Sequence, residues 1–203
     1  MSGFVRITSG EFRGRKIATP DSPAVHPMGD REKLALFNTL GPLSGSEHVL
    51  DCYCGSGALG LEAISRGAKS VVFVDRNVRT ASENIRTLGV EAQCEVIKSS
   101  VNIFTSGSLR RTASKDWTVA RNDGPTVHCP NKDVNAAFDI ILLDPPYTDF
   151  HPEDFEGIAD LLAPGGRLVL SHPAEIAPES LFESLEFQKT KKFARCHLSF
   201  YTK

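Results

Sequence analysis

The pattern of apolar and polar positions divides the chain into two kinds of segment that alternate. Short, nearly continuous apolar runs end in polar or glycine-containing turns, and longer amphipathic segments follow them. Strands are predicted at residues 48–53, 70–75, 93–97, 138–143 and 166–171, and helices at residues 31–40, 59–66, 78–88, 154–162 and 179–185. Short apolar strands that alternate with helices indicate a mostly parallel sheet covered by helices on both faces.

The two ends of the chain depart from this alternation. Phe4–Ile7 and Arg15–Ala18 are short β-like runs separated by a turn that contains glycine, which predicts a small hairpin. Residues 186–193 and 195–201 follow each other with almost no loop, so we expect them to pair as an antiparallel hairpin. A mostly parallel α/β sheet that closes in one antiparallel hairpin is the layout of the class I, Rossmann-like methyltransferases that depend on S-adenosylmethionine (SAM).

We predict that residues 1–28 form the N-terminal β-hairpin and an extended linker, since prolines recur between residues 20 and 27. Residues 29–203 are predicted to form one SAM-dependent methyltransferase domain. The polar segment at about 105–137 interrupts this domain between its third and fourth strands. A loop of that length is uncommon inside a compact domain, so we interpret the segment as an insertion and assign it no catalytic residue.

The charge of the chain is unevenly distributed. The formal net charge is only −2, which argues against a protein that coats nucleic acid with its whole surface. Residues 1–20 nevertheless contain Arg6, Arg13, Arg15 and Lys16 against a single acid, and a second basic stretch follows residue 186. Local basic patches of this kind can contact phosphates even in a slightly acidic chain.

Several classes of protein are disfavoured by the sequence. No apolar run approaches the ~20 residues of a membrane span, and the N-terminus lacks the apolar core of a signal peptide. We therefore expect a cytoplasmic protein. The cysteines are odd in number and none has C-x-x-C spacing, which predicts reduced thiols. No His, Cys and carboxylate cluster has metal-ligand spacing, so no metal site is predicted.

The segment VLDCYCGSGALGLEA suggests a nucleotide-type site. Gly55, Gly57 and Gly60 form a G-x-G-x-x-G turn that opens a helix, where the backbone can approach a ligand closely and offers free N–H groups. Dinucleotide enzymes share this turn, so NAD remains an alternative. Asp51 before the turn would repel a pyrophosphate but can pair with an ammonium group, and Asp75 after the next strand can accept both ribose hydroxyls. The two acids favour SAM, which contains no phosphate.

The loop after the third strand offers a contact for the adenine of SAM. Ser99, Ser100 and Asn102 are the polar candidates there, and the register favours Ser100. The complete set of predicted cofactor-binding residues is Asp51, Gly55, Ser56, Gly57, Asp75, Arg76 and Ser100.

The fourth strand ends in Asp144-Pro145-Pro146-Tyr147, at the edge of the sheet where ligands of open α/β folds bind. The prolines stiffen the turn and remove backbone N–H groups, so carbonyl and carboxylate oxygens can face outward as acceptors. Such acceptors suit a planar amino group on a ring, and Tyr147 offers a face on which the ring can stack. Accepting the N–H bonds of the amine also stabilises the positive charge that develops on nitrogen during methyl transfer. We predict that these four residues form the catalytic site.

These motifs together resemble a known family. ITSGEFRGRKIATP, HPMGDREKLALFNTL, DCYCGSGALGLEAISRGA and DPPY, in this order, are similar to the RsmD-like family of bacterial 16S rRNA (guanine(966)-N(2))-methyltransferases. The resemblance covers nearly the whole chain apart from residues 105–137. It implies that SAM is the cofactor, that 16S rRNA or an assembly intermediate of the small ribosomal subunit is the partner, and that the exocyclic N2 amine of a guanine is methylated. The protein is expected to act as a monomer.

The resemblance also implies residues that contact RNA. They are Arg13, Arg15 and Lys16 of the hairpin and Pro27, Asp30 and Arg31 at the mouth of the site. Family members usually read R-P-T-[ST]-D-R at this mouth, whereas His26 and Met28-Gly29 replace three of those positions here. Two alternatives are kept open: an N6-adenine nucleic-acid methyltransferase, and a non-catalytic RNA-binding protein that retains the fold.

Overall fold

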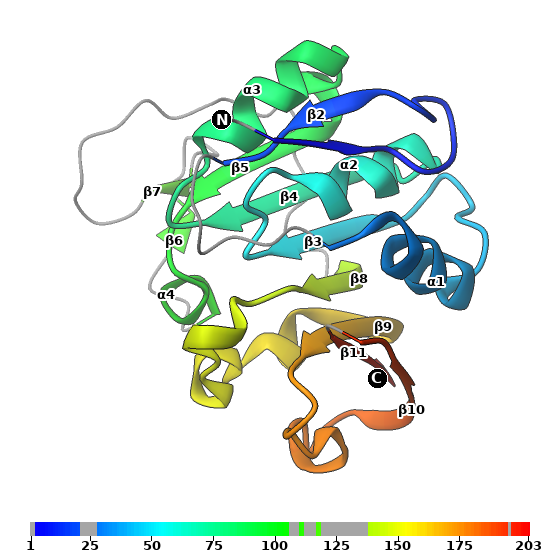
Figure 1. The fold of residues 1–203 in the computed structure, drawn as a ribbon. Coiled ribbons are helices and arrows are strands. Elements are labelled where there is room, and N and C mark those ends of the chain that lie inside the picture. Colours follow the sequence, from blue (N-terminus) through cyan, green and yellow to red (C-terminus); the bar gives the residue numbers. More distant parts are fainter. Residues whose placement is uncertain (1–2, 21–27, 106–109, 112–116, 119–137, 195) are drawn as a thin grey trace.

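The computed structural model describes residues 3–20, 28–105, 110–111, 117–118, 138–194 and 196–203. A seven-stranded sheet forms its centre, with the strand order β10-β11-β9-β8-β3-β4-β5 (Figure 1). The strands are β3 (His48–Cys52), β4 (Ser70–Asp75), β5 (Cys94–Lys98), β8 (Phe138–Leu143), β9 (Leu162–His172), β10 (Glu186–Lys192) and β11 (His197–Thr202). Strands β3, β4, β5, β8 and β9 are parallel, and β11 pairs antiparallel with both β9 and β10. The predicted mostly parallel α/β sheet that closes in one antiparallel hairpin is confirmed.

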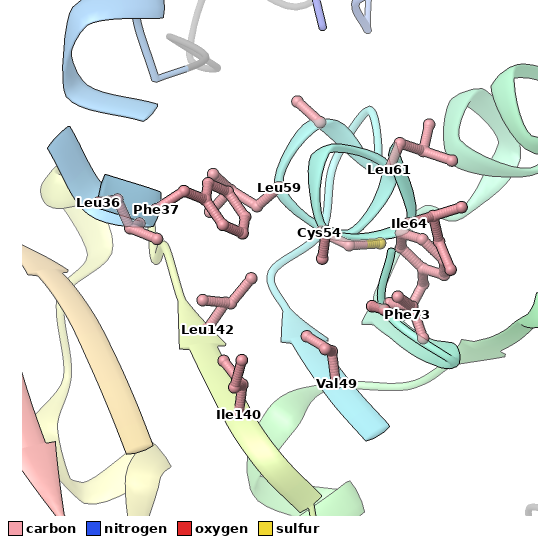
Figure 2. Packing of buried hydrophobic residues seen from close by; sticks show 14 of the residues in the cluster. Leu36, Phe37, Val49, Cys54, Leu59, Leu61, Ile64, Phe73, Ile140 and Leu142 are labelled. Carbon is pink, nitrogen blue, oxygen red and sulfur yellow. The ribbon is translucent and has the colours of Figure 1, made fainter. Parts of the chain in front are cut away.

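Three helices cover one face of this sheet. They are α1 (Asp30–Leu40), α2 (Ala58–Ser65) and α3 (Arg79–Leu88), and all three lie close to the ranges predicted from the sequence. Leu36 and Phe37 of α1 and Leu59 of α2 point toward Leu142 of β8 in the packed interior of this face (Figure 2). Burying this apolar layer is the main stabilising contribution to the fold.

The opposite face is covered differently from the prediction. Helices predicted at 154–162 and 179–185 are wrong: these segments contain short 3₁₀ turns, η3 (Pro152–Phe155), η4 (Ile158–Leu161) and η5 (Pro178–Ser180). Gly157 adopts φ +76° between the first two turns, which ends one before the other begins. Strand β9 then starts at Leu162, earlier than predicted. Together with the short helix α4 (Val101–Thr105), these turns bury Phe155, Ile158 and Phe182 against the sheet.

Three shorter features complete the described chain. The turn η1 (Glu91–Gln93) precedes β5, and η2 (Tyr147–Asp149) follows β8. Within the segment predicted as an insertion, β6 (Arg110–Arg111) and β7 (Trp117–Thr118) pair antiparallel, and most of the rest of that segment lies outside the described residues. In the described ranges, no helix has both the length and the apolar character that a bilayer crossing requires.

The N-terminal hairpin is attached to α2 by buried polar contacts. Strands β1 (Phe4–Arg6) and β2 (Lys16–Ala18) pair antiparallel, as predicted, and lie over α2 and α3 (Figure 1). Glu62 of α2 is fully buried and accepts hydrogen bonds from the backbone N and the Oγ1 of Thr8, both at 2.7 Å, and from Arg66 Nε at 2.8 Å. The division of the chain into two domains at residue 28 stays a prediction. Ile7 and Ile17 of the hairpin region belong to the same hydrophobic core as residues of the predicted methyltransferase domain.

Replacing Glu62 tests how strongly this contact holds the hairpin. Glu62→Ala leaves the N–H of Thr8 and the guanidinium of Arg66 without their buried acceptor, so we expect the free energy of unfolding to fall by about 3 kcal/mol. Urea denaturation followed by circular dichroism measures the loss. Glu83→Ala is the matched control, because Glu83 forms an exposed i,i+4 pair with Arg79 and should cost less than ~0.5 kcal/mol. Equal losses in the two variants would contradict the role given to Glu62.

Candidate active site

A cavity of about 380 Å³ opens at the carboxyl ends of β3, β4, β5 and β8. Its volume is typical of small-molecule sites. Strand β3 lies between β4 and β8. The strands that follow β3 directly, β4 and β5, are added on one side of it, and β8 and β9 are added on the other side. Open α/β sheets bind ligands at such a switch point. The predicted residues that line the cavity are Asp51, Gly55, Ser56, Asp75, Arg76, Ser100, Asp144, Pro145, Pro146 and Tyr147.

The glycine turn gives the cavity one wall. Gly57 adopts φ +78° at the N-terminus of α2, and its N–H donates to the carbonyl of Cys54 at 2.6 Å. Gly57 is not among the described residues that line the cavity, and its contact with the cofactor stays a prediction. A Cβ atom on Gly60 would lie 2.3 Å from Phe73 Cε1, so only glycine lets α2 pack this closely on β4.

Asp51 ends β3 beneath this turn. Its side chain is buried, and its Oδ2 accepts a hydrogen bond from the N–H of Gly60 at 2.8 Å. Burial, with a smaller contribution from the negative charges of Asp144 and Asp75, raises the pKa of Asp51 to about 8 against the opposing effect of the hydrogen bond from the Gly60 N–H. A carboxylate in this position gains most from a ligand that brings a positive charge.

Asp75 ends the neighbouring strand β4 and organises the turn from the other side. Its Oδ2 accepts from the N–H of Gly55 and its Oδ1 from the N–H of Asn77, both at 2.9 Å. A carboxylate oxygen has more than one acceptor site, so both oxygens can still receive a hydrogen bond from a ligand. Ser99 and Ser100 both line the cavity beyond Asp75, and Ser100 Oγ donates to Asn102 Oδ1 at 2.6 Å.

The residues after β8 form the opposite wall. Burial raises the pKa of Asp144 to about 6, and a hydrogen bond with Ser171 acts in the opposite direction. Tyr147 lies at the start of η2, and its hydroxyl is hydrogen-bonded to Ser171 Oγ on β9. Burial and the nearby charge of Asp144 raise the pKa of Tyr147, which keeps its phenol protonated.

The charge of the cavity is strongly one-sided. Among the described residues that line it, Asp51, Asp75, Asp144, Asp149 and Asp154 are acids, and Arg76 is the only cation. Opposite charges within about 4–6 Å favour ionised carboxylates, and like charges oppose them. The cavity therefore selects a cationic or amine-bearing ligand and disfavours a phosphorylated one.

Comparisons with known proteins agree with this geometry. A family model described as "Conserved hypothetical protein 95" matches residues 5–116 and 108–202. The chain belongs to this family. "Ribosomal RNA small subunit methyltransferase D" of Escherichia coli (strain K12) is 44% identical over 87 residues, 43% of this chain and 44% of the relative. The protein of the same name from Haemophilus influenzae is 36% identical over 149 residues, which cover 71% of this chain and 65% of the relative.

The RsmD-like family predicted from the motifs is thus confirmed, although the matched part of the chain spans less than half the length of the E. coli relative. A solved structure supports the fold over nearly its whole length. "Putative methyltransferase yhhF from Escherichia coli" superposes with a TM-score of 0.76 at 25% identity, covering 99% of this chain and 98% of that chain.

The RNA-binding residues predicted for this RsmD-like chain lie outside the cavity wherever the structure describes them. Arg13, Arg15 and Lys16 are exposed on the hairpin, and Arg31 is exposed on α1. Asp30 instead pairs with Arg6 at 3.5 Å and with Lys33 at 3.6 Å, which neutralises its charge. Pro27 lies outside the described residues, but the adjacent Met28 lines the cavity.

Sequence reasoning missed several residues of the site. Tyr53 lines the cavity and adopts φ +59°, a conformation rare for a bulky side chain. Ser171 and Cys196 lie next to Tyr147, although both are distant from it in sequence. Strand-end position could have indicated Ser171, because β9 is the parallel neighbour of β8. Cys196 precedes an antiparallel strand, and burial raises the pKa of its thiol, so it is a poor nucleophile.

Asp51→Asn tests the buried carboxylate. The pKa of Asp51 is about 8 in the folded protein and that of an unfolded Asp is ~4. Between these values the folded state holds a proton that the unfolded state has lost, so this group makes the wild type less stable as pH rises. Asparagine keeps an oxygen for the N–H of Gly60 and does not titrate. We expect the stability of Asp51→Asn relative to wild type to increase by at least ~1 kcal/mol between pH 5 and pH 8.

Urea unfolding at pH 5, 6.5 and 8 without any ligand measures this difference. The exposed Asp160 supplies the control, since Asp160→Asn should follow the wild-type curve. Parallel curves for Asp51→Asn and wild type would show that Asp51 does not carry the proton.

Proposed function

We propose that the protein is a SAM-dependent methyltransferase that transfers a methyl group to the exocyclic N2 amine of a guanine in 16S rRNA. One observation carries the proposal: the buried Asp51 of β3 and the half-buried Asp144 of DPPY lie at the carboxyl ends of adjacent strands and line the same cavity. One suits a cationic cofactor and the other suits the amine to be methylated. The names of the family relatives, which specify ribosomal RNA of the small subunit, support this substrate.

The residues of the cavity fit SAM. The buried Asp51 has no cationic side chain beside it among the described residues, so an ammonium group would supply the missing charge. Asp75 can accept both ribose hydroxyls, and Ser99 or Ser100 can meet the adenine at the end of β5. SAM supplies an electrophilic methyl group on a positively charged sulfur.

The residues of DPPY account for the chemistry at the target. Asp144, with a pKa of about 6, is ionised at neutral pH and can accept an N–H of the amine. This hydrogen bond orients the nitrogen lone pair and stabilises the positive charge that grows on nitrogen. Tyr147 can stack on a base that has been turned out of its helix. After methylation the nitrogen is acidic, and Asp144 or water can remove its proton.

The same proposal assigns the residues that contact the RNA and the state in which the enzyme acts. The exposed Arg13, Arg15, Lys16 and Arg31 would contact the phosphates of 16S rRNA or of a small-subunit assembly intermediate. Pro27 would contribute to the mouth, and Asp30 would orient its basic neighbours rather than contact a phosphate. We propose that the enzyme acts as a monomer in the cytoplasm.

Mass mapping of methylated nucleosides tests the reaction. The protein is incubated with SAM and with either naked 16S rRNA or unmodified small-subunit particles, and we expect N2-methylguanosine at one position. Asp144→Ala should lower the turnover at least ~100-fold, because it removes the acceptor for the developing charge. Its affinity for S-adenosylhomocysteine, measured by isothermal titration, should stay close to that of wild type. N6-methyladenosine as the product would replace the guanine assignment, and absence of S-adenosylhomocysteine binding would reject an enzyme.

A charge variant of the hairpin tests the RNA contact. Replacing Arg13, Arg15 and Lys16 together by Gln should weaken RNA binding by at least ~10-fold at low salt and reduce the slope of log K against log salt by about 2 to 3. Cofactor affinity should not change, because these side chains lie outside the cavity. Lys69→Gln serves as the control. It removes an exposed cation that directly precedes β4, at the amino ends of the parallel strands and away from the cavity. An unchanged salt slope in the triple variant would place the RNA elsewhere.

A further inference from the structure

Four side chains from separate elements meet beside the target-base site. Asp144 follows β8, Tyr147 begins η2, Ser171 lies near the end of β9 and Cys196 precedes β11. Ser171 is 1% exposed and connects the group. Its hydroxyl is hydrogen-bonded to the hydroxyl of Tyr147, and it lies close enough to the carboxyl of Asp144 to lower the pKa of that group through a hydrogen bond. The thiol of Cys196 lies beside Tyr147 and Ser171.

The direction of these hydrogen bonds follows from the number of protons available. A serine hydroxyl has one proton and two lone pairs, and an ionised carboxylate can only accept. Ser171 must therefore donate its one proton to Asp144 whenever Asp144 is ionised. The hydroxyl of Tyr147 must then donate to Ser171 Oγ. One serine thus connects the aromatic ring and the carboxylate in a fixed order.

The two partners of Ser171 have little other support. Pro145 and Pro146 have no N–H groups, and the N–H of Asp144 reaches the carbonyl of Cys52 only at 3.5 Å. Ser171 is held by contrast in the middle of the sheet, where it pairs with Leu198 of β11 while the preceding Leu170 pairs with Leu143 of β8. A rigid strand therefore anchors the first residues of this loop, where the backbone hydrogen bond of Asp144 is long. The loop's own backbone hydrogen bond, from the N–H of Asp149 to the carbonyl of Pro146 at 3.0 Å, comes only after Tyr147.

We propose that Ser171 is a positioning residue of the target-base site, which orients the Tyr147 ring and the Asp144 carboxylate relative to each other. The proposal rests on the proposed function for the identity of the base, but the contacts themselves do not. Ser171 also makes Asp144 easier to ionise, since a donated hydrogen bond stabilises the charged form. Loss of the hydroxyl should consequently disturb both the geometry and the pH dependence of the site.

Other charged or titratable groups around Asp144 must be accounted for in a pH experiment. Asp51 faces it from the end of β3, and Tyr147 and Cys196 face it from η2 and the start of β11. Glu32 of α1 acts on Cys196 beyond them. Replacing Ser171 also removes a neighbour of Tyr147 and Cys196, but burial raises the pKa of both groups, so neither ionises in the range where Asp144 titrates. Asp51 keeps its own partner, the N–H of Gly60. A shift in the titration of Asp144 therefore reports the lost hydrogen bond.

Two substitutions separate the two contacts of Ser171. Ser171→Ala removes both, so we expect kcat/KM for RNA to fall ~10- to 100-fold and the acidic limb of the pH–rate profile to move upward by ~1 unit. Tyr147→Phe keeps the ring and the bond from Ser171 to Asp144. It should lower kcat/KM but leave the acidic limb where it is in wild type. Ser171→Thr retains a hydroxyl, so the acidic limb of its pH–rate profile should lie at the wild-type pH.

Ser199→Ala is the matched control for a purely structural role. Ser199 is also a buried serine, on the neighbouring strand β11, and its hydroxyl contacts His172 Nε2 and Thr190 Oγ1, both at 2.7 Å. The variant loses buried hydrogen bonds but makes no contact with Asp144 or Tyr147 in the described structure. We expect its pH–rate profile and kcat/KM to match wild type even where its melting temperature falls.

The titration of the Asp144 side-chain carboxyl, followed by carbon NMR in the substrate-free protein, completes the test. An upward shift in Ser171→Ala and none in Ser199→Ala supports the proposal. Wild-type activity and titration in Ser171→Ala overturn it, whatever the melting temperature. If the wild type methylates no RNA, the proposed function fails, and the NMR shift alone then decides whether Ser171 holds Asp144.

Discussion

A group of acidic side chains at one edge of the sheet, with Asp51 fully buried among them, is the constraint on which the site depends. Asp144 follows β8, Asp51 is the next-to-last residue of β3 and Asp75 is the last residue of β4. The three strands are neighbours in the sheet, and all three acids line one cavity. Backbone N–H groups of the glycine turn accommodate part of this charge through Gly55 and Gly60. Burial is the main cause of the raised pKa of Asp51, and the charges of Asp144 and Asp75 add to it. Folding therefore leaves a free-energy cost at this edge, which a ligand with an ammonium group and a sulfonium can offset.

The hairpin and the glycine turn are joined by one buried side chain. Asn84 of α3 accepts from the N–H of Ala18 and donates to the carbonyl of Ala18, both at 2.9 Å, and it also donates to the carbonyl of Ser56 at 2.8 Å. The amide thus extends the edge of β2 and fixes the turn that lines the cavity. Because Glu62 holds the same hairpin from α2, the basic surface and the cofactor wall belong to one packed unit.

Sequence patterns predicted the parts of the structure that local chemistry determines. The apolar runs located the sheet, and the strand-end acids and glycines located the cavity, because carboxyl ends of parallel strands share an edge. The prediction of a helix at 154–162 was wrong because Gly157 adopts a left-handed conformation in a stretch with helical periodicity. Ser171 and Cys196 were not found. The strand-end position of Ser171 was a usable signal, but the approach of Cys196 to Tyr147 depends on the antiparallel pairing of β11 with β9, which no local pattern encodes.

The shape of the turn does not by itself define the ligand. Gly57 with its positive φ and Gly60 against Phe73 explain why the loop is tight, and a dinucleotide site needs the same two features. The charge of the cavity distinguishes a dinucleotide from SAM as the ligand. A pyrophosphate in this cavity would meet Asp51 and Asp75 on one side and Asp144 on the other, with Arg76 as the one cation among the described lining residues. An amine donor beside DPPY and a cation beside the glycine turn each remove part of that repulsion, so the same electrostatics favours the cofactor and the methyl acceptor together.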